Sequence, residues 1–272
     1  MKTIDVHTHA FPNALAERAI AKLEAEAECP WKAFGTGRIA DLLESMDVAG
    51  VDVSVVCAIA TKPDQAEGIL KWCDGIRSDR IAPFPSVHPE TPGAGQWVQR
   101  IVGEGFRGIK LHAMYQQFAI DDPLLDEIYA AAEACGAVIA FHCGRDIAFP
   151  MDDDRAEPRR LARVIERFGD LKIIATHMGG WRMWDESDEL LVGRNVYFET
   201  SFSLPDLAPD RIVDMMHRHG MDRVLFGSDW PWARQDADVA GLRRLALDSR
   251  DLRGILSANA AKLLAIDDGA GD

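Results

Sequence analysis

Cysteine is scarce and irregularly placed in this chain. There are five, an odd number, without the regular spacing of a disulfide framework, so we expect reduced thiols buried in apolar segments. Basic residues are also outnumbered, with 30 lysines and arginines against 44 aspartates and glutamates and a net charge of −14. A nucleic-acid-binding face needs an excess of positive charge, and we therefore expect no nucleic acid partner.

Two kinds of hydrophobic segment are missing as well. No apolar run approaches the roughly 18 residues of a membrane span. The N-terminus lacks the basic segment and apolar stretch of a secretory signal peptide. We therefore predict a cytoplasmic protein without a membrane partner. A length of 272 residues and a hydrophobic content of 47% suit one globular domain over residues 1–272. The oligomeric state stays open, a homo-oligomer included.

Short apolar and β-branched runs recur along the chain and predict eight β-strands. Most of these runs are continuous rather than alternating, as in parallel strands that are covered on both faces. Amphipathic segments of helical period lie between them, among them Ile39–Ala49, Pro123–Cys135 and Glu157–Phe168. The predicted strands are Thr3–His7, Val51–Ala58, Ile81–Val87, Gly108–His112, Val138–His142, Lys172–His177, Val196–Thr200 and Val224–Gly227.

This alternation predicts an α/β fold, a (β/α)₈ TIM barrel with long loops at its C-terminal face. Three connections are longer than the others: Phe11–Arg38, Cys143–Glu157 and Gly180–Asn195. Their aromatic residues either form a lid and a substrate pocket or pack the loops down. A doubly wound open sheet is the alternative. It is disfavoured because ligand-type residues follow five or more strands, whereas an open sheet gathers them at one switch point.

Six of the eight histidines lie at or just after the ends of predicted strands. His7 and His9 are two residues apart on an extended strand, so they project from the same face. His142, His177 and Asp229 follow three later strands and complete a set of nitrogen and oxygen donors. Such a set suits Zn²⁺ best, with Mn²⁺, Fe²⁺ and Ni²⁺ as alternatives. Core histidines without a function would not gather at the same end of successive strands.

The remaining histidines give weaker signals. His112 shares the strand face of Lys110 and would line the pocket, whereas His88 would be a pocket wall at most. His217 and His219 lie at the C-terminus of a predicted helix, where contacts with the helix dipole and capping explain them. Side chains two residues apart on a helix diverge, so we predict no second metal site at this pair.

Motifs along essentially the whole chain resemble the amidohydrolase superfamily. They are D-V-H-T-H, G-I-K-L-H, F-H-C-G, T-H-M-G-G, G-S-D-W-P and S-A-N-A-A-K-L-L. The match is to the amidohydrolase-related branch, which includes aminocarboxymuconate semialdehyde decarboxylase-like enzymes. The resemblance implies that His7, His9, His142 and Asp229 bind a metal and that Asp229 also acts as general base. His177 would complete a second metal site or serve as an acid/base that orients the attacking water.

Lys110 lies inside an otherwise apolar strand, where an unpaired ammonium is costly to bury. In two-metal members of the superfamily a lysine at this place is carboxylated and bridges both ions. The alternatives are an anchor for a substrate carboxylate or the reacting oxygen, and a structural ion pair. Glu199 is a candidate partner of Lys110 or of a ligand histidine.

Arg145 and Trp181 on the long loops are expected to bind substrate together with His112.

These features predict a metal-dependent hydrolase with one or two divalent ions. It would attack an amide, ester or lactone carbonyl of a small, carboxylate-bearing molecule with metal-activated water. Metal-dependent, non-oxidative decarboxylation of an unsaturated or aromatic acid is the alternative, because the same ligands serve both reactions. A barrel that binds metal or ligand without turnover is a third reading, which the presence of the proton-accepting Asp229 disfavours.

Overall fold

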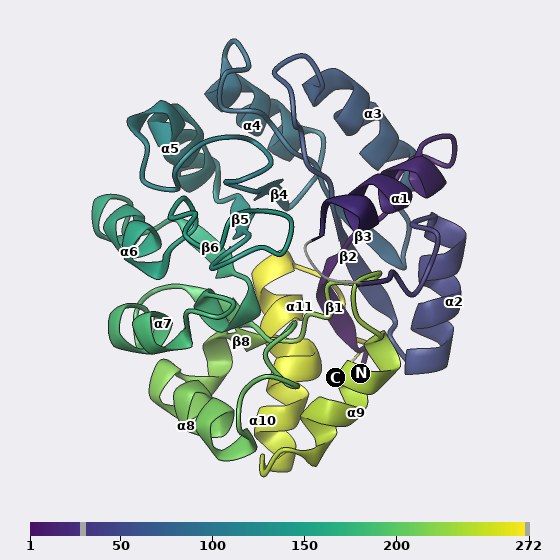
Figure 1. Cartoon of the computed structure of the whole chain (residues 1–272), viewed down its shortest axis with the longest axis vertical. Helices are drawn as coiled ribbons and strands as arrows, with labels where there is room; N and C mark the ends of the chain where they lie inside the picture. The colour runs from purple at the N-terminus through teal and green to yellow at the C-terminus, as the bar shows by residue number, and fades with distance from the viewer. Residues whose placement is uncertain (28–30, 270–272) are drawn as a thin grey trace.

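Parallel strands surrounded by helices make up the computed structural model, which describes residues 1–27 and 31–269. Figure 1 looks down the ring of helices. All eight predicted strands form, each within a few residues of its expected bounds. They are β1 (Ile4–Thr8), β2 (Val53–Cys57), β3 (Ile81–Phe84), β4 (Gly108–Leu111), β5 (Val138–Phe141), β6 (Lys172–Ala175), β7 (Tyr197–Glu199) and β8 (Val224–Leu225).

The strands pair in two parallel sheets, β1-β2-β3 and β4-β5-β6-β7-β8. Backbone hydrogen bonds also cross both seams. Between β3 and β4, the Lys110 amide of β4 donates at 2.8 Å to the carbonyl of Pro85, which directly follows β3. Beyond β8, the Asp229 amide donates to the His7 carbonyl of β1 at 2.7 Å. These bonds complete the ring, and the predicted (β/α)₈ barrel is confirmed.

Helices cover the outside of the barrel, and the helix predicted over Ile39–Ala49 has these bounds. It ends at Gly50, whose φ of 68° is the left-handed conformation that glycine adopts without steric cost. The helices are α1 (Ala16–Glu26), α2 (Ile39–Ala49), α3 (Ala66–Ile76), α4 (Ala94–Gly103), α5 (Asp126–Cys135), α6 (Pro158–Arg167), α7 (Trp184–Leu190), α8 (Pro209–His219), α9 (Gln235–Arg244), α10 (Ser249–Arg253) and α11 (Asn259–Leu264).

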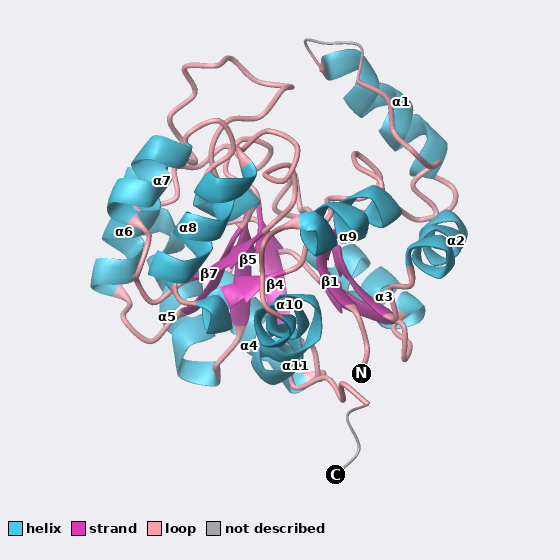
Figure 2. Cartoon of the chain, turned by 90° about the horizontal axis from the view of Figure 1, so that it is seen from below, coloured by secondary structure: helices cyan, strands magenta, loops and turns pink. Residues whose placement is uncertain are grey.

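Two of the three long connections contain helices that the sequence pattern did not predict. Helix α1 lies within residues 11–38 and α7 within residues 180–195. Helix α1 buries only Ala16 and Ile20, so its sequence carries little of the apolar stripe that marks a core-facing helix. In Figure 2 it stands away from the strands. Helix α7 is seven residues long, too short for helical periodicity to show.

Apolar side chains fill the barrel at the N-terminal end of its strands. Ile4, Val53, Val138 and Leu225 belong to one buried cluster that also includes Leu264 of α11. Helix α11 therefore covers the N-terminal end of the strands, as Figure 2 indicates. Because the interior is packed there, polar chemistry is confined to the opposite, C-terminal end. No helix in the described part of the chain is long and apolar enough to cross a membrane.

His219 has a different role from the one predicted. Its ring is buried and stacks on Phe198 at a centroid distance of 4.0 Å. Nδ1 accepts from the Gly193 amide at 3.2 Å, and Nε2–H donates to the Val196 carbonyl at 2.8 Å. Burial lowers the pKa of His219 to about 4, so the ring is neutral and cannot act as the cation that a helix dipole favours. The prediction for His219 was wrong, and exposed His217 keeps only a solvent-facing position.

This buried neutral ring predicts a loss of stability in acid. A histidine whose pKa is depressed from 6.5 to about 4 stabilises the fold above pH 6.5 and loses that contribution as pH falls toward 4. The free energy of unfolding should therefore drop by about 2–3 kcal/mol more between pH 7 and pH 4.5 in the wild type than in His219→Gln. Denaturant titrations at both pH values measure this difference. Parallel curves for the two proteins would contradict a neutral, buried ring.

Candidate active site

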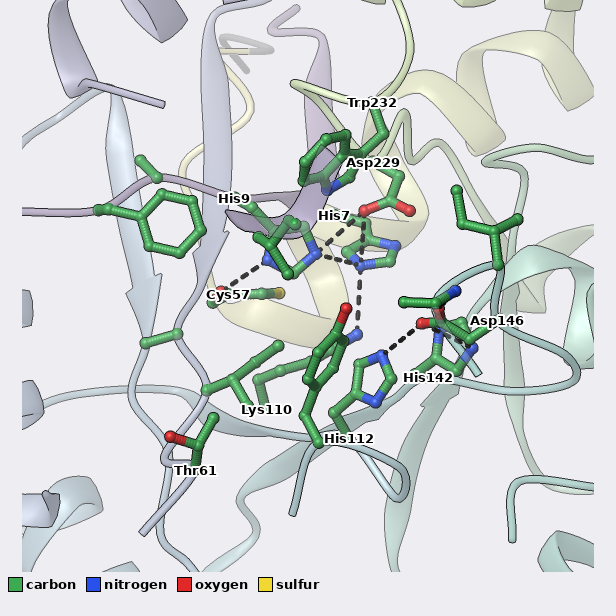
Figure 3. A pocket seen from close by; sticks show the side chains of 18 of the residues that line it. His7, His9, Cys57, Thr61, Lys110, His112, His142, Asp146, Asp229 and Trp232 are labelled. Carbon is green, nitrogen blue, oxygen red and sulfur yellow. Dashed lines mark hydrogen bonds and ion pairs between the residues drawn. The ribbon is translucent and has the colours of Figure 1, made fainter. Parts of the chain in front are cut away.

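A cavity of about 710 Å³ opens at the C-terminal ends of the strands. Figure 3 shows polar side chains from several strands converging on its floor. They come from the ends of β1, β4, β5, β6 and β8, because a parallel barrel directs all its strand ends to the same face. The predicted residues that line it are His7, His9, Lys110, His112, His142, Arg145, His177, Trp181 and Asp229.

Three potential ligand atoms from β1 and the segment after β8 form a tight triangle. Nε2 of His7 lies 3.1 Å from Nε2 of His9, and Asp229 Oδ1 lies 3.3 Å and 3.0 Å from these two atoms. Metal–ligand bonds of about 2.0–2.2 Å at right angles would separate neighbouring ligand atoms by about 3 Å. The spacing of the triangle therefore fits one divalent ion.

His142 and His177 continue this set on the neighbouring strands. Nδ1 of His142 lies 3.2 Å from Nε2 of His177. Ligand atoms of His7, His177 and Asp229 all lie within 4.8 Å of one another. The structure thus brings together the five side chains that the sequence predicted as metal ligands, although the bond from each to a metal stays a prediction.

Hydrogen bonds around the two β1 histidines determine which ring nitrogen carries the proton. Nδ1–H of His7 donates to Glu199 Oε1 at 3.1 Å, and Nδ1–H of His9 donates to the Cys57 carbonyl at 2.9 Å. Each acceptor has no proton of its own to give, so Nε2 of each ring keeps its lone pair. The two lone pairs face each other and Asp229 Oδ1.

The same pattern holds at His142 and His177. Nε2–H of His142 donates to the Arg145 carbonyl at 3.1 Å. The Ser201 hydroxyl donates to Glu199 Oε1 at 2.7 Å, so its oxygen is free to accept from Nδ1–H of His177 at 2.8 Å. The nitrogens of the two rings that face each other are therefore unprotonated as well. This arrangement, with the outer N–H of every ring held by an oxygen, is that of metal-binding histidines.

Asp229 Oδ1 is a further sign that the site is built for a cation. It is buried, and among the described residues no hydrogen-bond donor reaches it. Burial raises the pKa of Asp229, whereas positive charge on the neighbouring imidazoles of His7 and His9 lowers it below its ordinary value, and a cation bound between neutral rings would have the same effect. Burial also lowers the pKa of His7 and of His142 well below 6.5. Neutral rings and an ionised carboxylate are the forms that bind a metal.

Glu199 is the carboxylate that orients the histidines. It is fully buried and accepts from His7 Nδ1, from the His177 amide at 2.8 Å, and from the amide of Ser201 at 2.8 Å. Of the two partners predicted for Glu199, the structure selects the histidine and not Lys110. Gly227 leaves room for this carboxylate, because a Cβ there would lie 2.1 Å from Glu199 Oε2.

Glu199→Gln should therefore weaken metal binding by about 10- to 100-fold while leaving every metal-facing atom in place. The neutral amide no longer enforces the His7 tautomer or raises the basicity of its Nε2. Competition with a chelator of known affinity measures this change. Asp121→Asn is the matched control, because Asp121 forms ion pairs with Arg160 and Arg163 away from the cavity. Equal metal affinity in wild type and Glu199→Gln would remove Glu199 from this role.

Lys110 is fully buried on β4, and its Nζ lies 3.2 Å from Nε2 of His7. Among the described residues no carboxylate lies within 4.0 Å of Nζ, and the predicted structural ion pair is therefore wrong. A buried ammonium that donates to a ring nitrogen on the cavity floor is placed to meet an anionic group of a ligand. The carboxylated form stays an alternative prediction.

The sequence profile of the amidohydrolase family matches residues 4–266. The chain belongs to this family. It is thus an enzyme of the metal-dependent amidohydrolase superfamily, as the sequence motifs had indicated. A search of curated proteins found no match.

Solved structures of similar fold cover nearly all of this amidohydrolase. An uncharacterized TIM-barrel protein from Bordetella bronchiseptica is 19% identical, with a TM-score of 0.80 over 97% of this chain and 99% of its own. 2,6-Dihydroxybenzoate decarboxylase from Rhizobium is 18% identical, with a TM-score of 0.70 over 98% and 99%. A 5-carboxyvanillate decarboxylase from Novosphingobium aromaticivorans, complexed with manganese and 4-hydroxy-3-methoxy-5-nitrobenzoic acid, is 14% identical, with a TM-score of 0.72 over 97% and 96%. At these identities the likeness concerns the fold.

The three predicted substrate-binding residues of this amidohydrolase, His112, Arg145 and Trp181, all line the cavity. The polar groups of Arg145 and Trp181 already have hydrogen-bond partners within the protein. Arg145 donates to the Asp153 carbonyl and to Glu157 at 3.3 Å, so its guanidinium is already paired. Trp181 donates from its indole to Asp206 at 3.2 Å and presents its ring to the cavity. His88, which the sequence marked as a pocket wall at most, is not among the residues that line this cavity.

Sequence reasoning missed Asp146 and Ser201. Asp146 Oδ2 lies 3.3 Å from Nε2 of His112, whose ring stacks on His142 at 4.2 Å. These three form a second group of ligand-type side chains, but the Nε2–H of His142 donates to the Arg145 carbonyl, so this nitrogen offers no lone pair to the group. Asp146 follows His142 by four residues and Ser201 follows Glu199 by two, and these spacings were the only local signals.

Proposed function

We propose that this protein is a hydrolase that binds a divalent metal ion and acts on a small carboxylate-bearing molecule. The observation that supports this proposal is the convergence of unprotonated atoms of His7, His9 and Asp229 at separations of 3.0–3.3 Å. His7 Nε2 also accepts from Lys110, but His9 Nε2 and Asp229 Oδ1 repel each other unless a cation lies between them. Zn²⁺ suits such donors best, with Mn²⁺, Fe²⁺ or Ni²⁺ as alternatives. A bound ion would polarise the substrate carbonyl and lower the pKa of a water molecule toward about 7.

The side chains of this chain then have separate tasks. Asp229 takes the proton of the attacking water, because its ionised carboxylate lies in the cavity beside the metal-facing nitrogens. Lys110 binds the carboxylate of the substrate through its ammonium. His177 presents an unprotonated Nε2 and is held in place by Ser201. The rings of Trp181 and Trp232 line the cavity and exclude bulk water from it.

Decarboxylation of an unsaturated or aromatic acid is the second candidate, favoured by the apolar and aromatic side chains that line much of the cavity. Loss of carbon dioxide disperses the charge of a carboxylate, and apolar surroundings favour that change. The decarboxylase names of two proteins of similar fold are in line with it. The single domain over residues 1–272, the cytoplasmic location and the oligomeric state stay predictions.

Elemental analysis and product analysis test the proposal together. We expect about one divalent ion per chain in purified, untagged protein, and at least a 100-fold loss of turnover after chelation that Zn²⁺ or Mn²⁺ reverses. About two ions per chain would indicate a carboxylated Lys110, and none after supplementation would refute metal dependence. In a panel of acids, esters, lactones and amides, release of acid, alcohol or amine identifies a hydrolase. Carbon dioxide as the sole small product identifies the decarboxylase instead.

A further inference from the structure

The cavity extends beyond the metal-facing atoms into an apolar limb between α1 and α3. Leu15 and Leu23 come from α1 and its N-terminal flank, Ile59 follows β2, and Ile69 and Trp72 belong to α3. In Figures 1 and 2 these two helices lie on the same side of the barrel. We call these five residues the apolar limb.

Three of the five side chains of the apolar limb line the cavity without packing against the core, whereas Ile69 and Trp72 line the cavity and also pack against the main core cluster. Leu15 is 43% exposed, and Leu23 and Ile59 are half-buried. None of these three belongs to either buried hydrophobic cluster of the described residues. Clustered apolar surface that the fold leaves uncovered marks a place where an apolar ligand binds.

Aromatic rings also lie beside the histidines of the cavity. The ring of Phe202 lies 5.9 Å from that of His177, and on its other side 5.4 Å from that of Trp31. Trp31 is held in turn by a hydrogen bond of 3.1 Å from its indole to the Trp232 carbonyl. A ligand bound beside the histidines therefore meets these rings as well as the limb, because all of them line one cavity.

The charges of the cavity orient such a ligand. Lys110 and Arg145 are the lysine and arginine among the described residues that line it, and Arg145 is paired with Glu157. At the limb, Glu24 accepts from Lys32 at 2.6 Å and from the Ala33 amide at 2.9 Å, so it is neutralised by its own neighbours. We therefore expect the anionic group of a ligand to bind at Lys110 and the apolar part of the same ligand to lie in the apolar limb.

The cavity is larger than the space that a single-ring acid fills. Water takes up about 30 Å³ per molecule, so 710 Å³ corresponds to about 24 waters, several times the bulk of one aromatic ring. Sites of this volume hold ligands of drug size and cover most of their surface. A single ring at Lys110 would leave the limb filled with water against apolar side chains.

We propose that the substrate is a monocarboxylic acid whose apolar body is larger than one aromatic ring, with the carboxylate at Lys110 and the body in the apolar limb. This proposal rests on the function proposed above, because it takes the same cavity as the place of reaction. Leu15, Leu23 and Ile69 would then set the preference for body length. Each CH₂ group that enters the limb should raise affinity about fourfold.

Binding of two unreactive acids tests the proposal without turnover. Protein saturated with Mn²⁺ is titrated calorimetrically with benzoate and with biphenyl-4-carboxylate. We expect the second acid to bind at least about tenfold more tightly, because its outer ring enters the limb. Equal affinities would overturn the proposal. Lys110→Met should weaken both acids and leave 4-phenylbenzyl alcohol unaffected, whereas equal loss for acid and alcohol would remove Lys110 as the anchor.

A matched pair of surface variants locates the outer ring. Leu15→Glu puts a charge at the limb, and Leu124→Glu puts one at a leucine of similar exposure, 49%, outside the cavity. We expect Leu15→Glu to cut the affinity for biphenyl-4-carboxylate at least tenfold with benzoate unchanged, and Leu124→Glu to change neither. Equal effects of the two variants would refute the limb. Metal content and turnover are measured separately, so a failed length preference with intact metal binding refutes this proposal and not the function.

Discussion

Asp229→Asn should lower kcat by about 10³-fold in metal-saturated enzyme without unfolding the protein. The amide cannot take a proton from water, although it keeps the size of the carboxylate. The backbone at this position has φ of 64°, in the left-handed region that asparagine tolerates, and its amide keeps the hydrogen bond to the His7 carbonyl. For this reason asparagine is a better probe here than alanine, which would add backbone strain.

Steady-state kinetics on the preferred substrate, with circular dichroism as a folding check, measures this effect. Asp236→Asn is the control, because Asp236 lies on the same β8–α9 side, outside the catalytic cavity, and pairs with Arg234. Its kcat should equal that of the wild type. A kcat for Asp229→Asn within tenfold of the wild type would exclude Asp229 as the general base.

His7→Ala combined with His9→Ala should abolish tight metal binding. Two of the three atoms of the closest triangle are lost, and Asp229 Oδ1 alone gives one ligand on that side of the cavity. We expect less than about 0.1 ion per chain after desalting, and turnover at background, because activity depends on the ion. Elemental analysis of the purified variant gives the number directly.

Truncating His7 also leaves the buried Glu199 without one of its donors, so a loss of stability is expected as well. His9→Ala alone separates the two effects, because His9 donates to a carbonyl of the neighbouring strand and not to Glu199. It should lose metal affinity with little change in the free energy of unfolding. His217→Ala, at an exposed histidine outside the cavity, is the control for histidine removal. Wild-type metal content in the double variant would refute the N-terminal pair as ligands.

Local sequence was sufficient to predict the features that depend only on residues close together in the chain. The strands were predicted because continuous apolar runs bounded by helical segments indicate parallel strands that are buried on both faces. His7 and His9 were placed on one face because side chains of a strand alternate with a period of two. Helix α1 was missed because it buries only Ala16 and Ile20, so its apolar stripe is too weak to mark a helix that packs on the core.

The sequence by itself determined the barrel and the family, and it predicted the histidines and the aspartate that meet at the C-terminal end of the barrel, because periodicity and strand-end motifs are local properties of the chain. Tertiary structure alone decided which ring nitrogen of these histidines carries the proton. The proton on His7 is fixed by Glu199, 192 residues away, and that on His9 by a carbonyl 48 residues away. It also decided that no carboxylate of the described residues pairs with Lys110 and that Arg145 is already paired. Hydrogen bonds and ion pairs of this kind depend on which strand ends meet in space, and the spacing of residues along a chain does not encode that distance.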